Sequence, residues 1–184
     1  MACIKKLGTD IAYDCANLAN IGGTGEIDEA IIINSSDIAT VSETGSIGTI
    51  TMLTGKKGYV INSINNSVMY QDAIKVNDIA PPGEDQSVVI KVLGSASDLA
   101  GDLAGYREVV SQLIGGNYRV ALKTKSGRYL LAGAFCGLEA SDLATDSSTG
   151  GVSTVTLKTP EGATGDKLVT LTKAAYDGLK IPKV

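Results

Sequence analysis

The chain has 184 residues and a formal net charge of −4, and its acidic and basic residues are interspersed. A chain of this length is expected to fold as a single β-rich domain, residues 1–184, that buries about 70% of the surface its unfolded form would expose. It has no cluster of lysine and arginine of the kind that binds phosphates, so sequence-independent nucleic-acid binding is not indicated.

The composition favours strands and offers little catalytic chemistry. With seven tyrosines, one phenylalanine and no tryptophan, the core must be built from Ile, Val, Leu and Ala, which suits a sheet. The absence of histidine removes the commonest general base and the commonest zinc ligand. Cys3, Cys15 and Cys136 are odd in number and far apart, a pattern of neither a disulfide framework nor a CxxC metal motif, and we expect three reduced thiols.

The N-terminal residues lack the apolar segment of a secretory leader, and no run reaches the roughly 18 apolar residues of a membrane span. Assembly in a cytoplasm without a membrane partner is therefore expected. Residues 1–26 are interpreted as an N-terminal arm that ends in a glycine-rich loop. No Lys-Ser/Thr pair follows these glycines, and Glu26, Asp28 and Glu29 would repel a phosphate, so a nucleotide site is not indicated.

Short β-branched segments bounded by polar turns predict the next strands. They are Ala30–Asn34, Thr40–Glu43, Gly48–Leu53, Tyr59–Asn62 and Val68–Val76. The stretch from Thr44 to Asn77 is polar and resembles one long hairpin. Extended hairpins of this kind often pair with the edge of a neighbouring molecule. A meander folded on the domain's own sheet is equally compatible with the pattern.

A central strand and a helix are predicted next. Pro81–Asp85 should break the chain, because proline has no N–H for a β-ladder, and Ser87–Leu93 is apolar nearly throughout. A helix is predicted over about 97–114, ending at Gly115 and Gly116, because apolar residues recur at helical spacing. These apolar residues are Leu99, Leu103, Tyr106, Val110 and Leu113.

The clearest hairpin spans Asn117–Leu138. Apolar and polar or small residues alternate from Tyr118 to Lys123, Gly127 supplies the positive φ of a tight turn, and Tyr129–Phe135 returns as the second strand. A polar loop is expected after Glu139 and includes Thr145–Gly151. The remaining predicted elements are a strand at Val152–Thr159, a short strand at Leu168–Leu171 and a helical turn at Thr172–Gly178.

We expect no enzymatic activity, no metal and no cofactor. Asp142 and Asp146, on the predicted loop, are the only carboxylate pair worth considering for hydrolysis. Glycan-active sites usually also present aromatic rings, and this chain has few. The same acidic residues lack the spacing of an EF-hand calcium loop.

The predicted fold is mainly β with one flanking α-helix. The segment GRYLLAGAFCGLEASDLATDSSTGGVSTVTLKTPEG (Gly127–Gly162) resembles the corresponding part of phage tail tube and related tail proteins. In that family, a strand written Gly-x-Tyr/Phe-x-x-x-Gly leads into Gly-Leu-x-Ala-Ser, a polar loop and a Thr/Val-rich strand. The segments MACIKKLGTDIAYDCAN and EAIIINSSDI are similar to those of tail proteins from phages of Bacteroides-like hosts.

This resemblance implies a tail-tube-like β-sandwich or barrel with the helix on the outside. Six copies would close into a ring through edge-to-edge strand pairing, and rings would stack into a virion tail tube assembled in the bacterial host cytoplasm. The partners would be copies of the chain and other tail proteins, and DNA would pass through the lumen without specific binding. The long hairpin would reach an adjacent subunit through Lys56, Lys57, Tyr59, Asn65 and Asn66.

Other interpretations stay open at this point. The nearest are other virion parts: a tail terminator, a head–tail joining ring or a capsid decoration protein. A tube subunit of a contractile injection system is a further alternative. A secreted binding module is disfavoured by the lack of a leader segment and of aromatic residues, and an enzyme is disfavoured by the lack of histidine.

Overall fold

The computed structural model describes residues 26–62, 67–75, 83–92, 112–146, 152–161, 163 and 166–180. Their strands form one large mixed sheet, which confirms the predicted mainly β fold. The strands are β1 (Ile27–Asn34), β2 (Ile38–Thr44), β3 (Ile47–Met52), β4 (Tyr59–Asn62), β5 (Val68–Lys75), β6 (Gly83–Val92), β7 (Asn117–Thr124), β8 (Tyr129–Ala132), β9 (Leu138–Asp146), β10 (Val152–Lys158) and β11 (Val169–Leu171). A 3₁₀ turn, η2 (Ser35–Asp37), and a short helix, α3 (Lys173–Gly178), complete the described elements.

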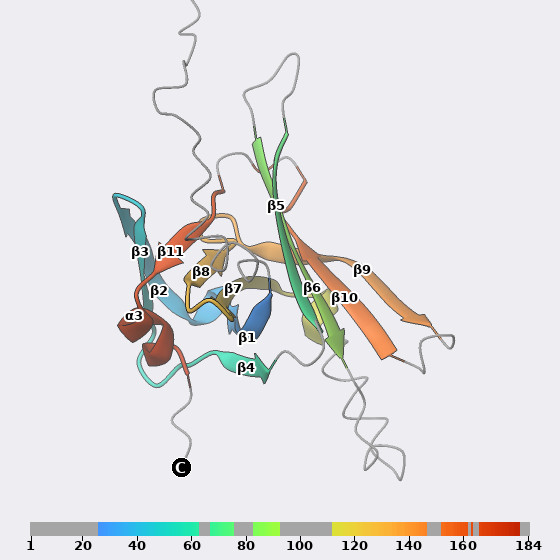
Figure 1. The fold of residues 1–184 in the computed structure, drawn as a ribbon, viewed down its shortest axis with the longest axis horizontal. Helices are drawn as coiled ribbons and strands as arrows, with labels where there is room; N and C mark the ends of the chain where they lie inside the picture. Colours follow the sequence, from blue (N-terminus) through green and yellow to red (C-terminus); the bar gives the residue numbers. More distant parts are fainter. Residues whose placement is uncertain are drawn as a thin grey trace, which may run out of the picture.

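The sheet divides into two branches at β7. One edge of β7 pairs antiparallel with β1 along its whole length, from Asn34 opposite Tyr118 to Ile27 opposite Thr124. Residues 120–123 on its other edge pair with β8, and residues 117–118 pair with β9. The first branch runs β8-β11-β3-β2 and the second runs β9-β10-β6-β5, on opposite sides of the β1–β7 pair (Figure 1). β4 lies on the outer edge of β1.

Strand β1 is buried on both faces, and its sequence reflects this. Side chains alternate across a strand, so a strand with one buried face alternates apolar and polar residues, whereas a strand buried on both faces has a continuous apolar run. Ala30 and Ile32 belong to the core shared with the second branch. Ile31 and Ile33 belong to the core beneath the first branch and α3. The run Ala-Ile-Ile-Ile therefore joins two hydrophobic cores.

Helix α3 closes the second of these cores. The Thr172 hydroxyl accepts a hydrogen bond from the Ala175 N–H at 3.1 Å, which is a normal N-cap, and confirms the predicted helical turn. Tyr176 is fully buried, and its hydroxyl donates to the Glu29 carboxylate at 3.1 Å. Lys180 pairs with the same carboxylate at 2.5 Å. The C-terminal helix is thereby attached to β1.

The predicted Asn117–Leu138 hairpin is confirmed as β7 and β8, with Gly127 at φ +82°. Its second strand ends at Ala132 rather than at Phe135, because Gly133 adopts φ +68° and the chain turns there. Strand β6 confirms the predicted strand at Ser87–Leu93 but begins earlier, at Gly83.

The prediction that residues 44–77 form one long hairpin is wrong. Only the turn after Thr44 connects adjacent partners, β2 and β3. β4 pairs with β1, and β5 pairs with β6. Each of these strands therefore extends a different part of the sheet, and the alternative of a meander on the domain's own sheet is closer to the structure.

The polar loop expected after Glu139 is wrong up to Asp146, because residues 138–146 form β9; residues 147–151 of this loop lie outside the described residues. This strand pairs with β10 from Glu139 opposite Lys158 to Asp146 opposite Val152. Residues 141–144 are exposed on both faces, so hydrogen bonding to β10 rather than burial holds them extended. The predicted helix at 97–114 and the arm at 1–26 lie almost entirely outside the described residues; residues 112–114 are helical and Leu113 is buried.

Burial of β1 on both faces predicts that two adjacent substitutions destabilise the fold to a similar degree. Ile31→Ala and Ile32→Ala should each lower the free energy of unfolding by about 2–5 kcal/mol, because each leaves a cavity in a different core. Thr51→Ala, at an exposed strand position, is the control. Urea denaturation followed by circular dichroism measures all three, and a large loss for only one of the two isoleucines would contradict this account.

Candidate functional site

The predicted contact residues lie near the connection between β3 and β4. Lys56 and Lys57 lie in this connection, and Tyr59 begins β4. Asn65 and Asn66 lie outside the described residues. The structure therefore brings three of the five predicted residues to one side of the first branch.

Both lysines contact groups of their own chain. The Lys56 Nζ atom lies 3.3 Å from the Asp37 carboxylate. That carboxylate also accepts a hydrogen bond from Asn34 at 2.9 Å, and the amide and the lysine together hold the pKa of Asp37 below its usual value. Lys57 Nζ donates to the backbone oxygen of Gly178 at 2.5 Å, at the end of α3 where the helix carbonyls lack partners. These contacts give the two lysines a role within the chain.

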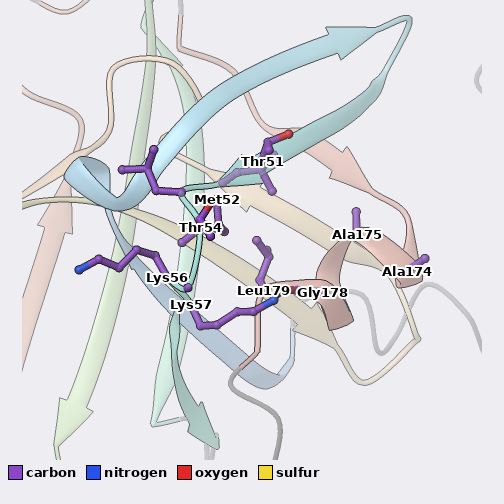
Figure 2. Close-up of a pocket in the computed structure, with 12 residues that line it drawn as sticks. Thr51, Met52, Thr54, Lys56, Lys57, Ala174, Ala175, Gly178 and Leu179 are labelled. Carbon is purple, nitrogen blue, oxygen red and sulfur yellow. Dashed lines mark hydrogen bonds between the residues drawn. The ribbon is translucent and has the colours of Figure 1, made fainter.

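An open groove of about 400 Å³ separates this connection from α3. Figure 2 shows Lys57 extending across the groove toward Gly178 while Lys56 points away from it. The groove walls are Met52 and Leu53 on one side and α3 on the other. Its lining carries hydroxyl and ammonium groups at the rim but neither a carboxylate nor a thiol. The groove therefore combines apolar side chains with threonine hydroxyl groups and the two lysines.

A second structured region is the turn between β8 and β9, residues 133–137. Asp166 is fully buried, and its carboxylate accepts hydrogen bonds from the backbone N–H groups of Phe135 and Cys136 at 3.2 and 3.1 Å. Arg119, from β7, donates to the backbone oxygens of Ala134 and Phe135 at 3.0 and 3.3 Å. The two charged side chains thus satisfy the backbone groups that this turn cannot pair in a ladder.

The electrostatics of this turn suppress rather than activate its thiol. Burial raises the pKa of the Cys136 thiol, the Asp166 carboxylate raises it further, and Arg119 opposes them. Burial lowers the pKa of the Arg119 guanidinium, and the negative charge of Asp166 partly offsets this by raising the same pKa. Reactive cysteines have lowered pKa values, so Cys136 has the environment of a structural residue.

The turn presents the only phenylalanine of the chain at the surface. Phe135 is 42% exposed, beside a hollow of about 250 Å³. The opposite wall of this hollow is the start of β2, from Ile38 to Val41. A fixed aromatic ring and a strand edge therefore share one surface.

Edge-to-edge pairing was expected from the resemblance, and Tyr59 of β4 was among the predicted contact residues, but β2 was not predicted as an open edge. Among the described strands, β2 pairs only with β3, and β4 pairs only with β1. Local sequence patterns identified both strands, but no local pattern reveals which strand lacks a second neighbour. The signal available in β2 was its composition, Ile-Ala-Thr-Val-Ser-Glu-Thr, which contains a single charged residue.

The carboxylate pair considered for hydrolysis lies on a strand rather than on the predicted loop. Asp142 and Asp146 lie on β9, and Asp142 is exposed. The described residues contain no group of three or more His, Cys, Asp or Glu side chains placed to hold a metal ion. None of the described helices is long and apolar enough to cross a membrane.

Comparisons with protein-family models, with curated proteins and with solved structures find no match to this chain.

The contact at the end of α3 predicts a stabilising role for Lys57. Lys57→Met should lower the free energy of unfolding by about 0.3–1 kcal/mol, because a charge at the C-terminal carbonyls is lost while the alkyl chain is retained. Lys173→Met, at the opposite end of the same helix, is a control that should not destabilise. Thermal denaturation measured by circular dichroism provides the test. Equal losses from both variants would argue against the proposed capping role.

The turn at 133–137 predicts a coupled effect of Asp166 on stability and on thiol chemistry. In a Cys3→Ser, Cys15→Ser background, Asp166→Asn should cost about 1–3 kcal/mol, because buried hydrogen bonds to a carboxylate are weakened. Removing the negative charge should also lower the pKa of Cys136, so its reaction with a disulfide reagent should begin at lower pH. Asp142→Asn is the exposed control. A pH profile that does not move would mean that Asp166 has no electrostatic effect on the thiol.

Proposed function

We propose that this chain is a structural subunit that joins to copies of itself through the edges of its sheet, and that the assembly is the hexameric ring of a phage tail tube. The observation that supports self-assembly is the edge of β2. A strand at the end of a sheet presents unpaired backbone N–H and C=O groups, which form a template for another strand.

Strand β2 has only part of the protection that is usual at such an edge: it has an inward-pointing charge at Glu43 and a bulge between Ile38 and Thr40, but no lysine or proline. Soluble proteins place lysines, prolines or inward-pointing charges on edge strands. Ile38–Thr44 contains neither lysine nor proline. Its one charged residue, Glu43, is turned into the protein and paired with Lys167 at 2.7 Å. Association of β2 with another strand therefore requires no unpaired charge to leave water.

A second open edge at β4 makes a ring contact possible. A contact between two different surfaces of identical subunits generates a closed ring or an open filament, depending on the rotation between copies. β2 and β4 are two such surfaces among the described strands. The segment Gly127–Gly162, which resembles tail tube proteins, contains β10 and the turn between β8 and β9. The two branches of the sheet separate at this turn.

The proposed conduit also agrees with the charge of the chain. A tube through which DNA moves should repel phosphates weakly rather than bind them, and a subunit with a net charge of −4 and no basic cluster has that property. Such a function needs a defined shape and charge but no bond-making chemistry. The tail-tube-like sandwich or barrel, the virion location and the other tail proteins as partners are parts of the same proposal.

The purified protein should therefore form rings or hollow tubes. Sedimentation velocity over a wide concentration range should reveal a species of about six copies or larger, and negative-stain electron microscopy should reveal a central hole. A protein that remains monomeric at high concentration contradicts the proposal. Rings that never stack would instead favour a tail terminator, a head–tail joining ring or a capsid decoration protein.

A further inference from the structure

Arg119, on β7, is half-buried and forms no ion pair with any carboxylate of the described residues. Its Nε and Nη2 groups donate to the backbone oxygens of Ala134 and Phe135. A guanidinium carries five N–H donors, so three of them remain after these two bonds. The charge of Asp166 acts on Arg119 from a longer distance than an ion pair. The described chain therefore leaves part of this guanidinium without an anionic partner.

The guanidinium lines the hollow of about 250 Å³ between the start of β2 and the β8–β9 turn. Among the described residues that line this hollow, Arg119 is the only charged one. Pockets that enclose a small molecule usually measure roughly 300–1,000 Å³. The smaller hollow, with the exposed ring of Phe135 at its side, suits one or two side chains of a protein better than a whole small molecule.

The carboxylates beside the β2 wall of the hollow are already paired with lysines. Asp37, which precedes β2, pairs with Lys56 at 3.3 Å. Glu43, near the end of β2, pairs with Lys167 at 2.7 Å. Neither carboxylate therefore balances the charge of Arg119, and the hollow has a positive charge without a negative one at its wall.

The arginine and the aromatic ring are held in place by the backbone of the turn. Asp166 accepts hydrogen bonds from the N–H groups of Phe135 and Cys136, and Gly137 donates to the Gly133 oxygen at 3.0 Å. A surface that is ordered before its partner arrives loses little conformational entropy on binding. Arginine and aromatic residues also contribute most often to the binding energy of protein interfaces.

We propose that this hollow binds an acidic side chain of a partner protein, an aspartate or glutamate with an apolar residue next to it. The carboxylate accepts hydrogen bonds from the remaining N–H groups of Arg119, and the apolar residue packs on the ring of Phe135. Charge complementarity selects this occupant, because charge-assisted hydrogen bonds between a guanidinium and a carboxylate are strong and specific.

The site does not rest on the proposed ring. Residues 54–71, which include β4, contain neither aspartate nor glutamate. A contact between β2 and β4 of two copies therefore brings no carboxylate from this segment to Arg119. The proposed ring contact leaves the guanidinium for a second protein.

The test uses the fact that Phe135 is the only phenylalanine of the chain. Growth with para-fluorophenylalanine places a single fluorine at the site, which fluorine NMR then observes alone. The probe is the blocked peptide Ac-Ser-Leu-Glu-Leu-Ser-NH₂, and its matched control has Gln in place of Glu. The Glu peptide should shift the resonance saturably, with a Kd roughly fivefold or more below that of the Gln peptide. Added salt should reduce this difference.

Two variants assign the preference to the guanidinium. Arg119→Gln should raise the Kd of the Glu peptide to that of the Gln peptide. Arg128→Gln makes the same change at an exposed arginine between β7 and β8, and it should leave both values unchanged. Circular dichroism checks that each variant is folded. If Arg119→Gln does not fold, the comparison of the two peptides on the unmodified chain still decides.

The outcomes separate this site from the proposed function. Equal Kd values for the two peptides on the unmodified chain, or no shift with either, overturn the site. Sodium acetate that shifts the resonance at the same concentration as the Glu peptide overturns the assignment to a protein segment. Preferential binding of the Glu peptide by a chain that stays monomeric supports the site and contradicts the tube. Rings that bind neither peptide overturn the site alone.

Discussion

The pairing of β1 with β7 is the interaction on which the rest of the fold depends. β1 contributes side chains to both hydrophobic cores, and β7 is hydrogen-bonded to strands on both of its edges. In the hydrogen-bonded order of the described strands, the two branches are connected through this pair. Because interiors are close-packed, the apolar run of β1 fixes the distance between the two cores as well as stabilising each of them.

The division of the sheet at β7 creates a local problem of hydrogen bonding. Where β8 leaves β7 and β9 begins, the backbone of residues 133–137 can no longer pair in a ladder. Buried peptide groups without partners are costly, and the chain satisfies these with the side chains of Asp166 and Arg119 from either side. Gln86 adds a hydrogen bond from the second branch, accepting from the Gly133 N–H at 2.8 Å. Residues distant in sequence therefore hold the point at which the branches separate.

The sequence alone predicts the elements whose periodicity and turn chemistry are local. The β7–β8 hairpin is of this kind, because alternation and Gly127 both lie within it, and so is α3 with its Thr172 cap. β9 was missed because residues 141–144 are exposed on both faces, so the extended form of this part comes from pairing with β10 rather than from an apolar pattern.

The sequence patterns also could not predict which strands pair with each other. The strands of residues 44–77 were largely identified, yet their neighbours come from distant parts of the chain, so one hairpin was a natural but wrong interpretation. Lys56 and Lys57 were predicted as contacts because the resemblance to tail proteins implied a long hairpin at this position that reaches an adjacent subunit. The structure brings Asp37 and the end of α3 to them, and no feature of the local sequence contains that information. Asp166 was likewise not selected, because a lone aspartate in a turn has no distinguishing pattern.

The internal packing also has a consequence for assembly. In the proposed ring, the curvature would depend on the angle between the two edges, β2 and β4, through which neighbouring subunits would pair. β4 is attached directly to β1, and β2 is attached through β3, β11 and β8 to β7. Both edges are therefore oriented by the same β1–β7 pair, and the number of subunits that close a ring would follow from the way two cores pack around one strand. If the proposed ring exists, a change that shifts this pair should alter ring closure, and the hydrophobic interior would then help to determine the shape of the assembly.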